Sequence, residues 1–133
     1  MAKEFIHPVN VYYEDTDFSG LVYHANYLKF CERAREHMIG VPVLVALYNE
    51  TGMGFVVYKA EITYKDAAAF GDALEVRSTA TKASEYRLAF NQDIYRVKDN
   101  KLLVACIIDI VCVDKTKKMV ALPPVVTGLL EKL

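Results

Sequence analysis

The sequence predicts an α+β fold in which one long helix lies against an antiparallel sheet. Two periodicities carry this prediction. Apolar residues recur at helical spacing between Asn26 and Gly40, whereas several later runs alternate between apolar and polar positions. The strands offer the apolar surface against which the helix must bury its stripe. The 133 residues suffice for one domain with a hydrophobic core, so we expect a single domain over residues 1–133.

The first predicted strand lies near the N-terminus. Val9, Val11 and Tyr13 alternate with two less apolar neighbours, and Pro8 stands near the start of the run. The stretch EDTDFSGLVYHANY follows as a loop over residues 14–27. Its second half is too apolar and aromatic for a solvated loop, so we expect it to line a pocket.

The central helix is predicted to begin at Asn26, a residue type favoured at helix N-caps, and to end at Gly40. Its apolar stripe comprises Tyr27, Cys31, Ala34 and Met38. The basic residues of its second half suit the negative end of the helix dipole: Arg33, Arg35 and His37. A second, short helix is expected over residues 42–50, with a stop at Gly52.

The remaining strands follow from period-two alternation. The first of them is expected to share one face among Val56, Tyr58, Ala60, Ile62 and Tyr64. Two more follow over residues 74–80 and 86–94. The nearly uninterrupted apolar run over residues 102–113 predicts a strand that is covered on both faces. A short strand over residues 119–122 and a helical tail are expected to end the chain.

Composition excludes several function classes. Hydrophobic residues make up 53% of the chain and the net charge is −1 without a basic stripe, so we expect a globular protein that does not bind nucleic acid. No apolar run is long enough to cross a bilayer and no secretory leader is evident, so we expect no integral membrane segment and a cytoplasmic location.

The cysteines and histidines do not form a recognisable metal site. Three cysteines without a CxxC pair argue against disulfides and structural zinc. His7, His24 and His37 are widely separated in the sequence, and we expect no metal and no cofactor. Cys31 lies on the apolar helix stripe, which favours a core position over a catalytic pair with His24.

The aspartates of the loop admit three interpretations. The run DTDFSG resembles the start of an EF-hand calcium loop, but such a loop needs a glutamate at its twelfth position, where Asn26 stands. Asp15 and Asp17 can also be turn residues that accept bonds from nearby backbone N–H groups. Alternatively, a carboxylate beside the free N–H groups of a helix N-terminus can act on an acyl group whose oxyanion those groups hold.

The loop carries a longer motif, TDFSGLVYHANY, over residues 16–27. This run is similar to the signature of the hotdog-fold acyl-CoA thioesterases, in particular the YbgC-like branch and the 4-hydroxybenzoyl-CoA thioesterases. The C-terminal stretches CVD, residues 112–114, and LP, residues 122–123, also resemble that family. The resemblance implies a hotdog fold, in which a curved antiparallel sheet wraps a long central helix, and a single thioesterase domain over residues 1–133.

The resemblance also implies roles for individual residues. Asp17 takes the position of the family's catalytic carboxylate, as nucleophile or as general base, and Gly20 permits the chain reversal that presents it. His24 takes the position whose backbone N–H faces the thioester oxygen. The further substrate-binding candidates are Tyr23 and Tyr27 for the acyl pocket and Lys82 and Arg87 for the CoA phosphates. A solvated hairpin is the alternative for the segment that contains the last two.

The function implied is hydrolysis of an acyl-CoA thioester to free acid and CoA, in a homodimer or homotetramer with sites at the subunit interface. An acyl-carrier-protein thioester is an alternative substrate. Two other classes stay open: a non-catalytic hotdog protein that binds acyl thioesters, and an acyl-thioester hydratase or dehydratase. Asp109 interrupts the most apolar strand, and the sequence assigns it no role.

Overall fold

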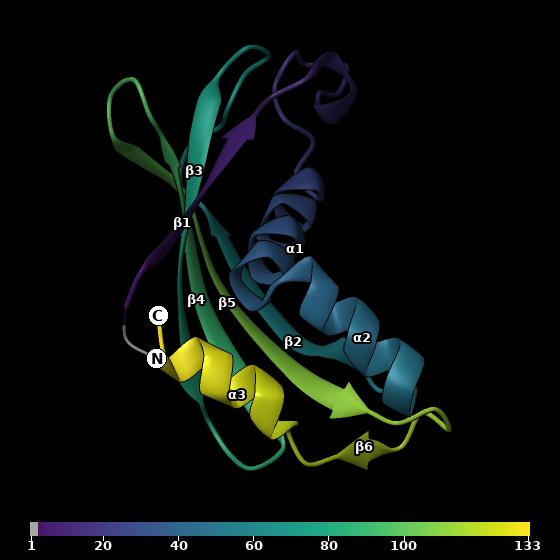
Figure 1. The fold of residues 1–133 in the computed structure, drawn as a ribbon. Helices are drawn as coiled ribbons and strands as arrows, with labels where there is room; N and C mark the ends of the chain where they lie inside the picture. The colour runs from purple at the N-terminus through teal and green to yellow at the C-terminus, as the bar shows by residue number, and fades with distance from the viewer. Residues whose placement is uncertain (1–2) are drawn as a thin grey trace.

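A computed structural model describes residues 3–133 of the chain. Within this range, helix α1 (Asn26–Ile39) lies against a curved six-stranded antiparallel sheet (Figure 1). The strand order is β1 (Phe5–Asn10), β3 (Ala73–Lys82), β4 (Arg87–Arg96), β5 (Lys101–Val113) and β2 (Gly54–Tyr64), with β6 (Met119–Val120) paired to the end of β5. Three shorter helical segments complete the fold: η1 (Tyr13–Asp15), α2 (Val41–Thr51) and α3 (Pro124–Glu131). The predicted α+β hotdog architecture is confirmed.

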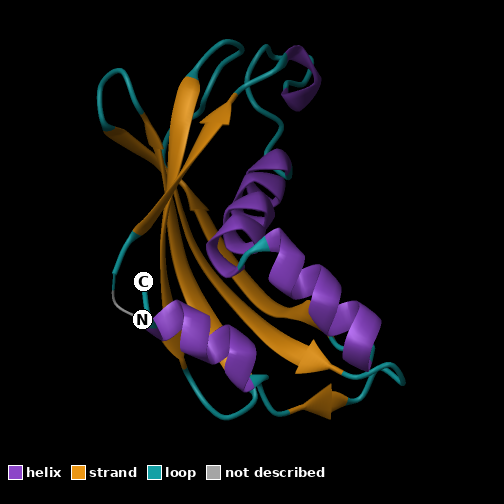
Figure 2. Cartoon of the chain, in the orientation of Figure 1, coloured by secondary structure: helices purple, strands orange, loops and turns teal. Residues whose placement is uncertain are grey.

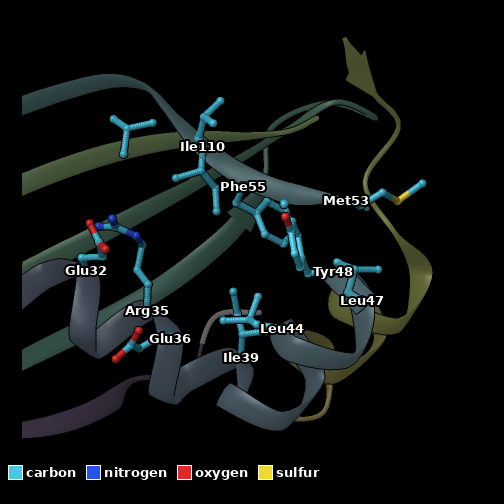
Figure 3. Close-up of a pocket in the computed structure, with 13 residues that line it drawn as sticks. Glu32, Arg35, Glu36, Ile39, Leu44, Leu47, Tyr48, Met53, Phe55 and Ile110 are labelled. Carbon is cyan, nitrogen blue, oxygen red and sulfur yellow. The ribbon is translucent and has the colours of Figure 1, made fainter. Parts of the chain in front are cut away.

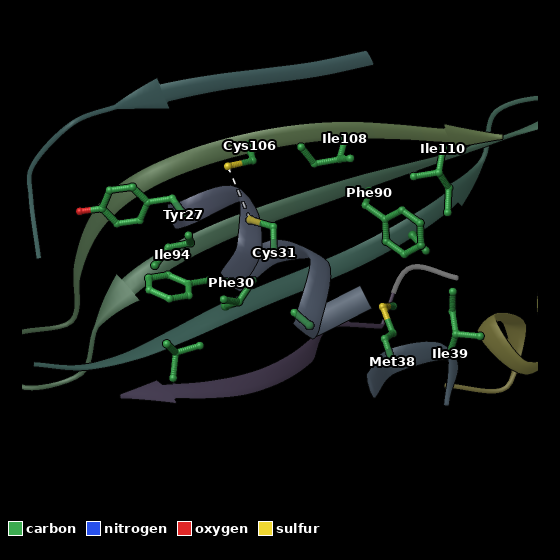
Figure 4. Close-up of a cluster of buried hydrophobic side chains, with 14 of the residues drawn as sticks. Tyr27, Phe30, Cys31, Met38, Ile39, Phe90, Ile94, Cys106, Ile108 and Ile110 are labelled. Carbon is green, nitrogen blue, oxygen red and sulfur yellow. Dashed lines mark hydrogen bonds between the residues drawn. The ribbon is translucent and has the colours of Figure 1, made fainter. Parts of the chain in front are cut away.

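The hydrophobic core lies between α1 and the sheet (Figure 4). All four residues of the predicted helix stripe are buried, and Phe30 extends the stripe. Alternate residues of the two central strands face it: Leu88, Phe90, Ile94, Val104, Cys106 and Ile108. Because each fully buried side chain of this size contributes about 1.5–3 kcal/mol, this contact fixes α1 in place.

The helix boundaries are close to those predicted, with one correction. Ala25 rather than Asn26 occupies the N-cap position of α1, and no side chain caps this end. The Asn26 side chain instead donates from Nδ2 to Asp15 Oδ1 over 3.0 Å, which ties the helix start to the preceding loop. The predicted ends at Gly40 and Gly52 are confirmed, with φ of 110° and 74°.

Two strand predictions are wrong in detail. Strand β1 ends at Asn10 instead of continuing to Tyr13, because the Asp15 carboxylate accepts the backbone N–H of Tyr12 and turns the chain. The predicted single face of β2 is also wrong. A β-bulge between Val57 and Lys59 shifts the register by one residue, so residues 56 and 60 lie on opposite faces of the sheet.

The prediction that β5 is covered on both faces is wrong as well. The helices lie on one side of the sheet, and the outer face is uncovered (Figure 2). Ile107 on that face is 46% exposed. Asp109 lies there too, with Oδ2 3.9 Å from Nε of Arg87 on the neighbouring strand. Asp109 therefore lies on the uncovered face of the sheet, beside a cation with which it forms no hydrogen bond among the described residues.

Gly52 offers a test of the α2–β2 connection. A Cβ atom at this position would lie 2.6 Å from Lys115 Cβ, and its φ disfavours L side chains. We expect Gly52→Ala to lower the free energy of unfolding by about 1–3 kcal/mol in urea denaturation. The matched control is Gly54→Ala, because a Cβ there meets nothing within 4 Å. Equal stability of the two variants would contradict this packing.

Candidate active site

The loop between β1 and α1 reverses direction between Asp17 and Gly20. The N–H of Gly20 donates to the Asp17 carbonyl over 3.1 Å, and the N–H of Asp17 donates to the Leu21 carbonyl over 3.0 Å. Gly20 has a φ of 83°, in the left-handed region that favours glycine. The chain reversal expected at Gly20 is thus present, and it leaves the Asp17 side chain exposed to solvent.

Asp17 is held in its ionised form by its neighbour Ser19. Oδ1 accepts the Ser19 hydroxyl and also the Ser19 backbone N–H, the latter over 2.7 Å. These donors hold the pKa of the Asp17 carboxyl below its usual range, the hydroxyl making the largest contribution. The second oxygen, Oδ2, has no hydrogen-bond partner among the residues that the structure describes. A carboxylate oxygen is therefore available for chemistry at neutral pH.

Asp15 has the opposite environment and a structural role. Its carboxylate is buried and accepts from the backbone N–H of Tyr12 over 2.9 Å and from Asn26 Nδ2. Its carbonyl accepts the N–H of Tyr23 over 2.8 Å. Asp15 thus fastens both halves of the loop to the start of α1.

His24 lies two residues before Asn26, the first residue of α1. Its own N–H donates to no group in the described part of the chain. The Tyr64 hydroxyl donates to the His24 carbonyl over 2.9 Å, which holds the backbone in this orientation. The imidazole packs against the Tyr23 ring, with centroids 4.5 Å apart. This arrangement presents a positively polarised N–H from the end of a helix.

A cavity of about 400 Å³ joins these groups. Its lining includes Asp17, His24, Tyr27, Tyr64 and Lys65. The Tyr27 ring belongs to the core, because it is buried and its hydroxyl accepts the N–H of Ala68 over 3.0 Å. Tyr64 and Lys65 were not among the sequence candidates, since strand periodicity does not tell which loop the end of a strand will meet.

Lys82 and Arg87 lie elsewhere. They flank the turn between β3 and β4, at the opposite end of the sheet from the Asp17 loop (Figure 1). The Arg87 guanidinium faces Asp109 and lies 5.8 Å from the ring centroid of Tyr58 on the outer sheet face. One copy of the chain therefore does not bring these two residues to Asp17.

A second cavity of about 470 Å³ lies between α1, α2 and β2 (Figure 3). Its wall is mostly apolar and includes Ile39, Leu44, Leu47, Phe55 and Ile110. Glu32 and Arg35 also line it, from the middle of α1. The cavity thus lies toward the other end of α1 from the Asp17 of the same chain.

The thiols and imidazoles do not form an alternative centre. All three cysteines are free and buried, as expected, and Cys31 Sγ lies 3.8 Å from Cys106 Sγ. This contact and burial raise the pKa of the Cys31 thiol, which opposes a nucleophilic role. The fold does bring two distant histidines together, since the rings of His7 and His37 stack at 4.8 Å. Among residues 3–133, no group of three or more His, Cys, Asp or Glu side chains is placed to hold a metal ion.

Comparison with known proteins identifies the family. Residues 11–130 match the model of the thioesterase-like superfamily. The YbgC acyl-CoA thioester hydrolase of Escherichia coli is 42% identical over 119 residues, with 87% of each chain covered. The YbgC acyl-CoA thioesterase of Haemophilus influenzae is 38% identical, with 90% of this chain and 88% of that chain covered. The chain therefore belongs to the thioesterase-like superfamily.

Solved structures agree with this assignment. The crystal structure of a 1,4-dihydroxy-2-naphthoyl-CoA thioesterase from Synechocystis superposes with a TM-score of 0.90, at 26% identity and with 98% of each chain covered. A probable thioesterase from Bartonella henselae gives a TM-score of 0.83 at 28% identity, covering 91% of this chain and all of that one. In the described range, no helix is long and apolar enough to cross a membrane.

The environment of Asp17 can be tested by titration. We expect Ser19→Ala to raise the pKa of the Asp17 carboxyl toward its usual range, because the strongest donor to the ionised form is removed. The measurement is carboxyl ¹³C NMR over a pH series. The matched control is Thr116→Ala, since Thr116 donates to Asp114 in the same way at a distant turn. An Asp17 pKa that is unchanged in Ser19→Ala, or that changes equally in the control, would show that the Ser19 hydroxyl is not what lowers it.

Proposed function

We propose that the protein is an acyl-CoA thioesterase in which the Asp17 carboxylate acts as nucleophile or general base and the His24 backbone N–H holds the thioester oxyanion. The observation that carries the proposal is an exposed, ionised carboxylate that shares a cavity with His24, whose backbone N–H has no partner among the described residues and lies next to the N-terminus of α1. The family assignment supports it, because relatives with 42% and 38% identity are named acyl-CoA thioester hydrolase and acyl-CoA thioesterase.

The reaction needs only these groups and water. The thioester carbonyl oxygen accepts the His24 N–H, which polarises the carbonyl carbon. Asp17 then either attacks that carbon or removes a proton from a water molecule that attacks it. The negative charge of the tetrahedral intermediate rests on the oxygen at the helix N-terminus. Collapse of the intermediate breaks the C–S bond, and the CoA sulfur leaves as thiolate and takes up a proton. In the nucleophilic route, water hydrolyses the resulting anhydride and restores Asp17.

The proposed enzyme is a homodimer that forms through the β2 edge. Both ends of the sheet are edges, but they differ. Strand β1 has six residues and contains Pro8, which has no N–H to donate to a further strand. Strand β2 has eleven residues without proline. Exposed apolar side chains accompany the free backbone groups of β2: Val56, Val57, Tyr58 and Tyr64. A second copy that pairs antiparallel about a two-fold axis satisfies those groups and covers those side chains.

This pairing completes the site. About a two-fold axis near the middle of β2, Tyr64 of one copy lies beside the Gly54 end of the partner strand. Tyr64 belongs to the Asp17 cavity, and Phe55, next to Gly54, belongs to the larger apolar cavity. The catalytic carboxylate of one copy therefore works beside the apolar cavity of the other, which receives the acyl group.

The same symmetry brings the predicted CoA-binding residues near. Arg87 pairs with Val111 on β5, and Val111 pairs with Val56 on β2. The β3–β4 turn and the Gly54 end of β2 therefore lie at the same end of the sheet. The partner's copy of this turn, which carries Lys82 and Arg87, reaches the mouth of the composite site. Tyr23 and Gly20 shape the mouth from the Asp17 side. A carrier-protein substrate, a tetramer, a single domain over residues 1–133 and a cytoplasmic location stay predictions.

Replacement of Asp17 tests the chemistry. Asp17→Asn keeps the shape of the side chain but removes the base or nucleophile, so kcat/KM for acyl-CoA should fall at least about 100-fold. Free-thiol release from a panel of short, long and aromatic acyl-CoAs measures this. The control is Asp114→Asn, because Asp114 occupies the same kind of turn. Its carboxylate accepts from the backbone N–H and the hydroxyl of Thr116, two residues later in the chain. Near wild-type turnover in Asp17→Asn would sink the mechanism.

A charge on the β2 edge tests the assembly. Wild type should migrate in light-scattering chromatography at twice the 15.0 kDa chain mass, and Val57→Asp should shift it toward a single chain. Ile6→Asp on the β1 edge is the control, because the two side chains are equally exposed, at 50% and 51%. A wild-type monomer, or an oligomer that resists Val57→Asp but not Ile6→Asp, would contradict the β2 interface.

A further inference from the structure

Arg35 is a charged residue in the buried face of α1. Only 7% of its surface is exposed. Its Nη1 donates to Gln92 Oε1 on β4 over 2.9 Å. The Gln92 amide nitrogen donates in turn to the Cys31 carbonyl over 2.9 Å and to Ser78 Oγ over 3.0 Å. Both N–H donors of the Gln92 amide are therefore used, and its oxygen accepts from the guanidinium and orients it.

Most of the donors of Arg35 have no protein partner. A guanidinium carries five N–H donors, and the bond to Gln92 uses one of them. None of the ion pairs formed within residues 3–133 involves Arg35. Glu32 and Glu36 line the same cavity from the same helix, and Glu32 is exposed to solvent. Arg35 is thus a buried cation with no carboxylate within salt-bridge distance among the described residues, and the Glu32 carboxylate acts on it only from farther away.

Arg35 lines the apolar cavity of about 470 Å³ between α1, α2 and β2, beside Glu32 at one end of the cavity (Figure 3). A cavity of this size is within the range of small-molecule sites, and its wall is mostly aliphatic and aromatic. Such a wall suits the body of an acyl chain, but a bare methyl end would leave the guanidinium donors unpaired. Among the described residues, the only buried side-chain N or O atom without a partner is Arg87 Nε, so water reaches the unbonded nitrogens of Arg35. A methyl-terminated chain that fills the cavity would displace that water and offer no acceptor in return, so a ligand that supplies an acceptor is favoured over one that does not.

We propose that this cavity selects acyl groups whose far end carries a hydrogen-bond acceptor, a carboxylate or a carbonyl oxygen, which binds the free N–H groups of Arg35. The inference rests on the proposed thioesterase function and names its substrate class. Gln92 is a positioning residue, because it aims the guanidinium without reaching the ligand. Leu44, Phe55 and Ile110 surround the intervening methylene groups.

Matched substrates test the selection in the wild-type protein. Hexanoyl-CoA, 5-oxohexanoyl-CoA and adipoyl-CoA have the same number of acyl carbons and end in a methyl group, a methyl ketone and a carboxylate. The same three end groups are compared at eight and ten carbons. We expect kcat/KM to be about 10- to 100-fold higher for an acceptor-bearing chain than for the methyl-terminated chain of its length, as for a hydrogen bond to a charged group. The ketone and carboxylate arms distinguish a neutral acceptor from an anionic one.

A variant assigns the selection to Arg35. Arg35→Met keeps an unbranched stem and removes the donors, so the ratio of kcat/KM for acceptor-bearing chains to kcat/KM for methyl-terminated chains should fall to about one. Arg33→Met is the control, since Arg33 is exposed on the same helix and should keep the preference. Circular dichroism establishes that each variant is folded. The comparison of substrates in the wild-type protein does not depend on either variant.

Two failures are distinguishable. Wild type that hydrolyses the methyl-terminated chains at least as well at every length overturns the inference and leaves the thioesterase function intact. The same holds if folded Arg35→Met keeps the wild-type preference. No hydrolysis of any acyl-CoA overturns the proposed function, and the inference with it.

Discussion

Burial of the α1 stripe against β4 and β5 determines where everything else in this molecule can lie. Once Tyr27, Phe30 and Cys31 are fixed under the sheet, the helix axis cannot rotate or slide without opening the core. The N-terminus of α1 then points at the Asp17 loop, and its second half forms a wall of the larger cavity. One packing contact therefore positions both the proposed oxyanion donor and the proposed acyl pocket.

Some polar residues stabilise the fold, whereas others have hydrogen-bonding groups left for a substrate. Asp15 is buried and satisfied by backbone and side-chain donors, so it stabilises the loop, whereas Asp17 two residues later is exposed with one oxygen free. Gln92 is buried with all of its amide groups bonded, whereas Arg35 beside it has donors left over. In each pair the satisfied residue holds its neighbour in position, and the unsatisfied residue is the one that can meet a substrate.

The sequence predicts the elements well because helix and strand periods are local properties. The α1 stripe and the stops at Gly40 and Gly52 follow from spacing and residue type, whereas the turn at Gly20 was expected from the family motif. Features that depend on tertiary contact were missed. The bulge after Val57 is set by pairing with β5, and the burial of Arg35 depends on the Gln92 acceptor on β4. The position of Tyr64 depends on the His24 carbonyl, forty residues earlier in the chain. Asp17 and His24 were predicted as site residues from the motif, whereas no local pattern marks Tyr64 as their neighbour.

The central claim is that hydrolysis needs Asp17 of one copy beside the apolar cavity of a second. The most direct measurement is thiol release from one acyl-CoA, expressed as turnover per chain, over a dilution series whose dimer fraction is followed by light scattering. We expect turnover per chain to fall with the dimer fraction, and Asp17→Asn to be at least about 100-fold less active than wild type at every concentration. Turnover per chain that is the same in monomer and dimer, or activity that survives in Asp17→Asn, would contradict it.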